Sequence, residues 1–233
     1  MRKKAIFNWS GGKDSSMALH KMLNDDQFDI RHLLTSLNTE TDRISMHGVR
    51  RSMLERQVKA LGFPLSVLEL PGHINMEEYD QLMHEKLAPF LAEGITHSIF
   101  GDIFLEDLKA YRDERLKAVG LTGHYPIWKR DTTELVREFV SLGFKAVVVA
   151  IDGSKLDQSF AGRELDMDFV NDLPAGVDPC GENGEFHSFV YAGPIFKESF
   201  DFERGEVVGK SYKLSNDSED EVTYWFQDLI PVD

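Results

Sequence analysis

A glycine-containing stretch near the N-terminus, Ser-Gly-Gly-Lys-Asp-Ser at residues 10–15, most constrains the fold of this chain. It follows a short apolar run at residues 5–7, which predicts a buried strand. Apolar side chains between Met17 and Leu23 then recur at the spacing of one face of an amphipathic helix. The stretch is therefore predicted to be a turn from a strand into a helix.

Such a turn can bind a phosphate group. Gly11 and Gly12 can adopt positive φ at little steric cost, so consecutive backbone N–H groups can point into one concavity. The start of the helix adds unsatisfied N–H groups and the positive end of the helix dipole. The hydroxyls of Ser10 and Ser15 can donate hydrogen bonds, and Lys13 supplies a positive charge. These residues predict a phosphate site; the alternative is a glycine-rich turn that binds nothing.

Spacing excludes two commoner phosphate loops. A Walker A loop would have glycine five places before Gly12 and Ser or Thr directly after Lys13, but those positions hold Phe7 and Asp14. The stretch also lacks the Gly-x-Gly-x-x-Gly pattern of dinucleotide-binding folds.

Composition limits the partners. The 233 residues carry 26 basic and 40 acidic side chains, for a formal net charge of −14, which makes a nucleic-acid partner unlikely in our interpretation because a phosphate backbone requires clustered Lys and Arg. No apolar run approaches membrane-spanning length, and only three apolar residues follow the basic start before Asn8. We therefore expect a cytoplasmic protein without membrane contact. A single cysteine, Cys180, excludes an internal disulfide and a cysteine-rich zinc site.

Strand-like and helix-like segments alternate along the first two thirds of the chain. Strands are predicted at residues 5–7, 30–37, 65–70, 98–100, 126–128 and 145–151, and helices at 49–61, 76–92, 105–119 and 135–142. This alternation predicts an α/β fold with an open, mainly parallel sheet covered by helices on both faces. Two loosely alternating segments, 206–214 and 222–230, predict antiparallel strands in a smaller α+β C-terminal domain. We place the domains at residues 1–130 and 131–233.

Polar residues follow the predicted strands at the edge where ligands bind in open α/β sheets. Ser36 and Asn38 end the second strand, and Gly101 and Asp102 follow the fourth. His47 precedes the helix predicted at residues 49–61. We expect these residues near a nucleotide; the alternative is that they are ordinary polar loop residues.

A second concentration of chemical groups lies late in the chain. Residues 178–188, Asp-Pro-Cys-Gly-Glu-Asn-Gly-Glu-Phe-His-Ser, hold carboxylates, an amide and a histidine before the apolar run at residues 189–191. A turn rich in Gly and Asn is the alternative reading. So many titratable groups in one turn favour a binding or catalytic site.

The loop at residues 10–15 resembles the Ser-Gly-Gly-x-Asp-Ser loop of the PP-loop (N-type) ATP pyrophosphatases. With Phe-Gly-Asp-Ile at residues 100–103, the charged helix after it, and Gly-Glu-Asn-Gly-Glu-Phe-His at residues 181–187, the chain is similar to the diphthine–ammonia ligase family. The resemblance implies a PP-loop, HUP-like Rossmann-type fold. It also implies a ligase that uses ATP and Mg²⁺ to adenylate a carboxylate, releases pyrophosphate, and forms an amide with ammonia.

The resemblance also implies roles for individual residues. Pyrophosphate and nucleotide binding falls to Ser10, Gly11, Gly12, Lys13, Asp14, Ser15, Ser36, Asn38, His47, Gly101 and Asp102. Substrate binding falls to Glu106, Gly181, Glu182, Asn183, Gly184, Glu185 and His187. The catalytic residues among them are Lys13, Asp14, Glu185 and His187, with Asp14 as a ligand of Mg²⁺.

One departure from the family pattern bears on the substrate. Archaeal and eukaryotic members carry glycine where this chain has Asn183, and Glu or Thr where it has His187. The chain resembles the bacterial branch, so the acyl substrate is left open, as is a homo-oligomeric state. The alternatives are an ATP-binding sensor without turnover and a tRNA-modifying PP-loop enzyme. Cys180 could act in sulfur transfer, but packing is the commoner role of such a cysteine.

Overall fold

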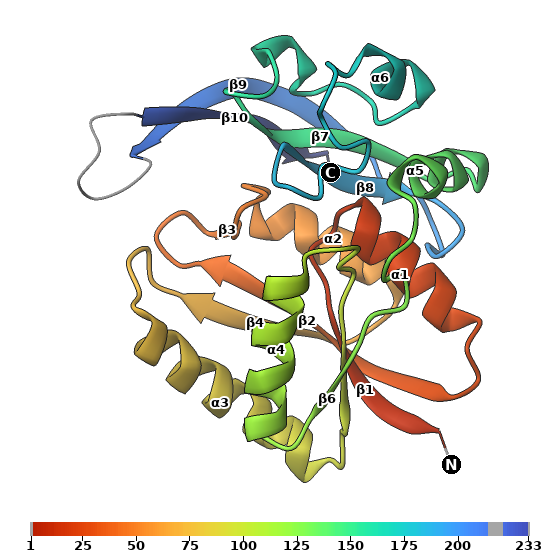
Figure 1. Cartoon of the computed structure of the whole chain (residues 1–233), viewed down its shortest axis with the longest axis vertical. Coiled ribbons are helices and arrows are strands. Elements are labelled where there is room, and N and C mark those ends of the chain that lie inside the picture. Colours follow the sequence, from red (N-terminus) through yellow and green to blue (C-terminus); the bar gives the residue numbers. More distant parts are fainter. Residues whose placement is uncertain (1, 214–220, 233) are drawn as a thin grey trace.

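The structure, a computed structural model, describes residues 2–213 and 221–232. Two β-sheets form separate layers, and helices α1 (Lys13–Leu23) and α2 (Arg51–Leu61) lie between them (Figure 1). One cluster of buried apolar side chains runs from the first sheet through these two helices into the second sheet. The two layers therefore share a core.

The first sheet is mainly parallel, as predicted. Its order is β3-β2-β1-β5-β6, and β4 also pairs with β2. All pairs are parallel except the short antiparallel pair of β2 with β3. The strands are β1 (Lys3–Asn8), β2 (Phe28–Asn38), β3 (Arg43–Ile44), β4 (Leu65–Leu70), β5 (His97–Ile99) and β6 (Thr122–His124).

Helices cover both faces of this sheet because its strands are apolar on both sides. In β1, Ala5 and Phe7 belong to the cluster that includes α1 and α2, while Ile6 points to the opposite face. There it packs with Leu87 and Phe90 of α3 (Met76–Ala92), in a cluster that also includes Leu116 of α4 (Glu106–Ala118). The α/β fold class and the covering of both faces are confirmed.

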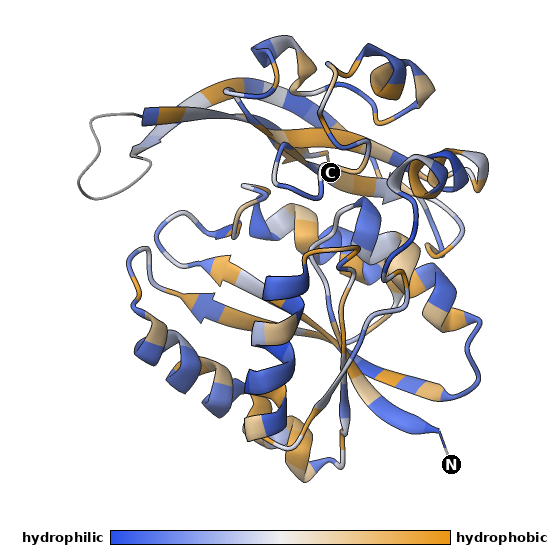
Figure 2. Ribbon diagram, in the orientation of Figure 1, coloured by the Kyte–Doolittle hydropathy of each residue, from blue (hydrophilic) through white to orange (hydrophobic). Residues whose placement is uncertain are grey.

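The second sheet is antiparallel, with the order β8-β7-β10-β9. Its strands are β7 (Lys145–Asp152), β8 (Phe186–Ala192), β9 (Phe202–Lys213) and β10 (Glu221–Pro231). Short helices accompany it: α5 (Thr132–Ser141), η1 (Gln158–Phe160) and α6 (Met167–Asp172). Figure 2 shows that β7 and β8 are hydrophobic and that α4 is hydrophilic over most of its length.

Helix boundaries follow local capping chemistry. Asn75 and Glu78 form a capping box at the start of α3, and Asp131 caps α5 by accepting a hydrogen bond from the N–H of Glu134. Gly62, at φ 77°, ends α2 in the left-handed conformation. By contrast Gly12, at the start of α1, offers no side-chain cap. The first turn of α1 therefore has N–H groups available to a ligand.

Two expectations from the sequence are wrong. Residues 126–128 form a turn rather than a strand, because Lys129 adopts a positive φ of 59° and its N–H bonds to the carbonyl of Ile103. The strand is β6, directly before it. Residues 145–151 form a strand as predicted, and residues 146–151 are buried. This strand is β7 of the antiparallel sheet, however, and does not extend the parallel one.

The C-terminal strands predicted at residues 206–214 and 222–230 correspond to β9 and β10, which pair antiparallel. Residue 214 and the connecting residues 215–220 lie outside the described part of the chain. The predicted domain boundary at residue 130 falls between the last strand of the first sheet and the first strand of the second. None of the helices in the described residues is long and apolar enough to cross a lipid bilayer.

Candidate functional site

The loop before α1 is closed by its own hydroxyl groups. Gly11 adopts φ +80°, which turns the chain from β1 into the helix. The Gly12 N–H donates to Ser10 Oγ at 3.3 Å, Ser10 Oγ donates to Ser15 Oγ at 3.1 Å, and Ser15 Oγ donates to the Gly12 carbonyl at 3.0 Å. The predicted strand-to-helix turn is thus present, with both hydroxyls at its centre.

Gln57 of α2 attaches this loop to both sheets. Its Nε2 donates to the carbonyls of Gly11 (2.9 Å) and Val190 (2.6 Å), and its Oε1 accepts from Trp9 Nε1 at 2.8 Å. The side chain is completely buried. Our sequence interpretation missed Gln57, because a lone glutamine in a helix gives no signal until its partners are known.

The loop also contacts β8 and the segment before α2. A Cβ on Gly12 would lie 3.0 Å from the Ser188 carbonyl oxygen and 3.1 Å from His47 Cε1, so only glycine fits without displacement. The N–H of Lys13 donates to Ser188 Oγ at 3.1 Å. The late segment therefore meets the start of α1 directly, 175 residues away in the chain.

Lys13 is almost fully buried and forms an ion pair with Asp14. Burial alone would lower the pKa of the Lys13 ammonium, but the Asp14 carboxylate and the Cys180 side chain outweigh burial and raise that pKa above its ordinary value. Lys13 is therefore a permanent positive charge inside the protein.

Cys180 is buried beside this pair. Its Sγ donates to the Thr132 carbonyl at 3.2 Å, and burial raises the pKa of the thiol to about 12. Nucleophilic cysteines need a lowered pKa. The surroundings of Cys180 fit packing rather than sulfur transfer.

Residues 178–185 form a tight turn directly before β8, and the turn is organised by its own carboxylates. Asp178 Oδ1 accepts from the N–H groups of Cys180 and Glu182. Glu185 accepts from the N–H groups of Asp178 and Asn183 and from Asn183 Nδ2. Since Glu185 is 4% exposed and bonded within its own turn, it shapes the turn.

Glu182 projects out of this turn toward the loop after β5. Its Oε1 accepts from the N–H of Ile103 at 2.7 Å and from the N–H of Phe104 at 3.3 Å. Burial raises the pKa of Glu182 to about 7, and the charges of Asp14 and Asp102 contribute to the same shift. The loop before α1, the loop after β5 and the turn before β8 are distant in sequence, and they meet around Asp14, Asp102 and Glu182.

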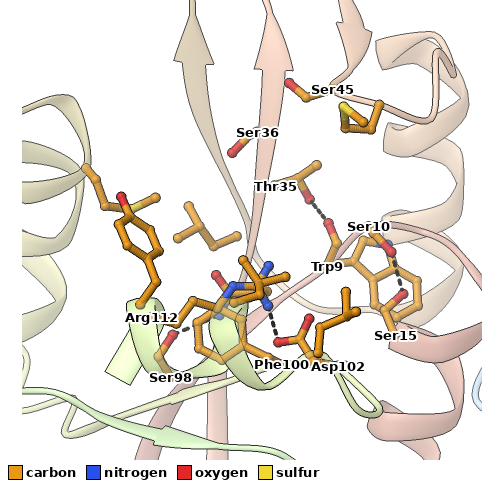
Figure 3. A pocket seen from close by; sticks show the side chains of 18 of the residues that line it. Trp9, Ser10, Ser15, Thr35, Ser36, Ser45, Ser98, Phe100, Asp102 and Arg112 are labelled. Atoms are coloured by element: carbon orange, nitrogen blue, oxygen red, sulfur yellow. Dashed lines mark hydrogen bonds and ion pairs between the residues drawn. The ribbon is translucent and has the colours of Figure 1, made fainter. Parts of the chain in front are cut away.

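The loop after β5 approaches α1 through Gly101. A Cβ there would lie 2.9 Å from the backbone of Asp14 and Ser15. The neighbouring Asp102 forms an ion pair with Arg112 of α4, whose guanidinium lies 4.6 Å from the centroid of the Phe100 ring. Figure 3 shows Arg112, Phe100 and Asp102 close together in the cavity, with Ser10 and Ser15 at a separate position.

Two histidines from different layers lie against each other in the site, with their ring planes tilted by 34°. The rings of His47 and His187 lie 4.6 Å apart between centroids, and His47 Nδ1 is 3.2 Å from the Ser188 carbonyl, to which it donates. Burial is the main reason that the pKa of His47 is lowered to about 3, and the neighbouring His187 lowers it further. Burial also lowers the pKa of His187 to about 4, with a smaller contribution from the charge of Lys13. Both imidazoles are therefore neutral at pH 7.

Most of the predicted site residues line one cavity of about 1250 Å³. Its lining includes Ser10, Gly12, Lys13, Asp14, Ser15, Ser36, His47, Gly101, Asp102, Gly181, Glu182, Asn183, Gly184 and His187. Four predicted residues lie outside the lining: Gly11, Asn38, Glu106 and Glu185. Asn38 Oδ1 accepts from the N–H groups of Glu40 and Thr41 and orders its own turn. Glu106 is exposed and pairs with Lys129 at 2.7 Å.

The cavity also extends between α3 and α4, a part that our sequence interpretation missed. Tyr79 and Met83 of α3 line it together with Leu108, Tyr111 and Arg112 of α4. We interpreted the apolar residues of the long helix at 76–92 as core, which is correct for Leu87 and Phe90. Leu87 also lines the cavity, and Tyr79 and Met83 lie eight and four residues before it on the same face of α3, so the apolar periodicity did not separate core from cavity wall.

Among the described residues, no three or more His, Cys, Asp or Glu side chains form a group that could hold a metal ion. The carboxylates of Asp14, Asp102 and Glu182 border the cavity as separate oxygen donors. Mg²⁺ is commonly held by one or two carboxylates together with substrate phosphates. This donor set fits that mode and does not fit an all-protein cage.

Known proteins share both halves of this chain. A family model described as the diphthamide synthase N-terminal domain matches residues 2–123, and a model of the diphthamide synthase C-terminal domain matches residues 131–216. A diphthine–ammonia ligase of Danio rerio is 24% identical over 222 residues, covering 85% of this chain and 86% of that protein. The Homo sapiens diphthine–ammonia ligase is 30% identical over 110 residues, covering 45% of this chain and 41% of that protein.

Among solved structures, a predicted subunit of tRNA methyltransferase from Methanocaldococcus jannaschii aligns with a TM-score of 0.38 and 19% identity, over 68% of this chain and 84% of that chain. The family models cover the first sheet, strands β7, β8 and β9 of the second sheet, and both loops that form the cavity. On that match, the chain belongs to the diphthamide synthase family.

Proposed function

We propose that this chain is an ATP-dependent ligase that adenylates a carboxylate, releases pyrophosphate and then forms an amide with ammonia. Its relatives are named diphthine–ammonia ligases, which supports a ligase. The observation that carries the proposal is the meeting of the loop before α1 with residues 181–188 in one cavity. A nucleotide and a second substrate can then react without leaving the site.

The loop before α1 suits the pyrophosphate end of ATP. The N–H groups in the first turn of α1, the hydroxyls of Ser10 and Ser15, and the buried charge of Lys13 face the same space. Departure of pyrophosphate builds negative charge, and donors fixed in advance stabilise that charge in the transition state. The rest of the nucleotide would lie toward Ser36, His47, Gly101 and Asp102 at the carboxyl edge of the sheet.

Magnesium fits this arrangement through Asp14, with phosphate oxygens supplying the remaining ligands. When bound, the ion would offset the phosphate charge during attack by the carboxylate. Lys13 adds a second positive charge to this site, because its ion pair with Asp14 outweighs the effect of burial on its pKa.

The turn at residues 181–188 suits the amide-forming half of the reaction. Ammonia attacks only as the neutral amine, so ammonium must first lose a proton. Glu182, whose pKa burial raises to about 7, is the stronger base in the cavity and can accept that proton. His187 is neutral and lines the cavity, so its ring nitrogen can accept a hydrogen bond from ammonium. Glu182 and Asn183 offer oxygen acceptors for the N–H groups of ammonium.

The acyl substrate is the part of the proposal that depends on Asn183 and His187. We interpreted these two residues from the sequence as departures from the pattern of archaeal and eukaryotic members, and both line the cavity. We therefore keep the carboxylate open and infer a substrate other than diphthine if those positions contact it.

Isotopically labelled ammonium tests the proposal. The protein is incubated with ATP, Mg²⁺, labelled ammonium and a bacterial metabolite extract, and the products are examined by mass spectrometry. The proposal predicts a labelled amide whose formation requires ATP. Nucleotide binding without any labelled product across varied extracts would favour the ATP-binding sensor instead.

A further inference from the structure

Strand β9 is a long open edge. The order β8-β7-β10-β9 places it at the end of the second sheet, where β10 is its only strand neighbour among residues 2–213 and 221–232. It has 12 residues, about twice the usual strand length, and Figure 1 shows it extending with β10 away from the helices. One side of its backbone therefore offers N–H and carbonyl groups to another strand.

The outer half of β9 also exposes two large apolar side chains. Val208 is 44% exposed and Tyr212 is 50% exposed, and both lie on the same face of the strand because side chains alternate. Long exposed edges with apolar residues pair with other strands unless charges prevent it. The charges of β9 therefore decide whether its edge pairs with another strand and in which register.

The charges of β9 are arranged symmetrically about Val208. Glu206 lies two residues before Val208 and Lys210 lies two residues after it. In an antiparallel pair of two β9 strands with Val208 on the twofold axis, Glu206 opposes Lys210 of the partner subunit and the two copies of Val208 meet. Arg204, which pairs with Glu164 of its own chain, then opposes Tyr212 of the partner subunit.

Neighbouring registers lack this complementarity. Centring the pair on Val207 would set Arg204 against Lys210 of the partner subunit, which is a like-charge contact. Centring it on Gly209 would set Val208 against Lys210 of the partner subunit and leave Glu206 without a basic residue opposite. Only even shifts keep opposed side chains on one face, so these are the nearest competitors.

We propose that two copies of this chain associate through antiparallel pairing of β9 with β9, centred on Val208, which joins their four-stranded sheets into one sheet of eight strands. The pairing satisfies the open backbone edge and covers the exposed Val208. The acid–base pair occurs twice by symmetry, so it both fixes the register and adds affinity. The cavity described above lies on other elements and is not part of this interface.

Charge reversal tests the proposal, read by sedimentation velocity over a wide range of protein concentration. Wild type is expected at twice the 26.5 kDa of the chain. Glu206→Lys and Lys210→Glu each place like charges opposite each other twice, and each should raise the dissociation constant roughly tenfold to a hundredfold. Glu114→Lys, at an exposed position on α4, changes the net charge in the same way as Glu206→Lys and should leave the dimer intact.

Mixing the two weakened variants is the decisive step. In a mixed pair, Lys at 206 faces Glu at 210 and Lys210 faces Glu206, so both contacts become attractive and the dimer should re-form. The double variant Glu206→Lys with Lys210→Glu should likewise dimerise. A wild type that stays monomeric, or a dimer that neither single reversal weakens, would overturn the proposal, as would failure of the mixture to associate while each variant remains folded.

Discussion

Two glutamates of one turn, Glu182 and Glu185, show how a side chain of one type takes different roles within four residues. Glu185 is buried and accepts hydrogen bonds from its own turn, whereas Glu182 borders the cavity with a pKa raised to about 7, chiefly by burial. The sequence identified both as site residues because the motif contains both. The two roles differ because each carboxylate accepts from different N–H groups: Glu182 from the loop after β5, and Glu185 from its own turn. These contacts cannot be predicted from the sequence.

At the same scale, Ser15 and Ser16 form a matched pair. Ser15 Oγ lines the cavity, while Ser16 Oγ is fully buried and has no hydrogen-bond partner among the described residues. Ser15→Ala should slow ATP cleavage roughly a hundredfold, because it removes a donor near the departing pyrophosphate. Ser16→Ala should leave the rate unchanged.

Steady-state rates of ATP cleavage and thermal unfolding curves for both variants check this prediction. If Ser15→Ala lost activity and stability in parallel, or if Ser16→Ala lost as much activity as Ser15→Ala, the hydroxyl of Ser15 would have a structural role instead.

At the scale of elements, the helix and strand periodicities were sufficient for most of the first sheet. The strand at residues 65–70 and the helix at 76–92 have the predicted bounds, since each is closed by Pro-Gly or by a capping box. The errors occurred where pairing rather than local pattern decides. Strand β7 follows a helix as in a βαβ unit, yet β8 and β10 pair with it antiparallel.

Helix α2 is the element through which the site depends on distant packing. Gln57→Ala would leave the Trp9 indole N–H without its acceptor and remove the donor to two carbonyls inside the core. We expect a loss of about 2–4 kcal/mol in the free energy of unfolding. Lys59→Ala, at an exposed position of the same helix, should change it by less than about 0.5 kcal/mol.

Urea denaturation of both variants measures these differences. A Gln57→Ala protein with the stability of Lys59→Ala would mean that the loop before α1 is held by other contacts.

At the scale of the whole molecule, the two sheets are joined by charge as well as by the shared core. Asp228 of β10 pairs with Arg43 of β3 at 2.8 Å and with Arg50, just before α2, at 2.6 Å. Burial alone would raise the pKa of Asp228, but Arg50 and Arg43 hold it below its ordinary value. Neither ion pair of Asp228 can be predicted from the sequence, because 185 residues separate it from Arg43 and 178 residues separate it from Arg50.

Asp228→Ala should therefore lower the free energy of unfolding by about 1–3 kcal/mol, since it leaves two arginines without their carboxylate. The pair of Arg2 with Asp26 is its control, because Asp26 is 96% exposed and Asp26→Ala should cost less than about 1 kcal/mol. A double-mutant cycle with Arg50→Ala measures the coupling. Additive effects of Asp228→Ala and Arg50→Ala would contradict a direct link between the sheets.

The central claim is that the cavity cleaves ATP between its α- and β-phosphates. Phosphorus NMR of a reaction containing the protein, Mg²⁺, ATP, ammonium and a metabolite extract separates the products directly. Adenylation of a carboxylate would give equal amounts of AMP and pyrophosphate. ADP with inorganic phosphate would contradict it, because the nucleotide would then be cleaved at the terminal phosphate and the loop before α1 would not be holding a departing pyrophosphate.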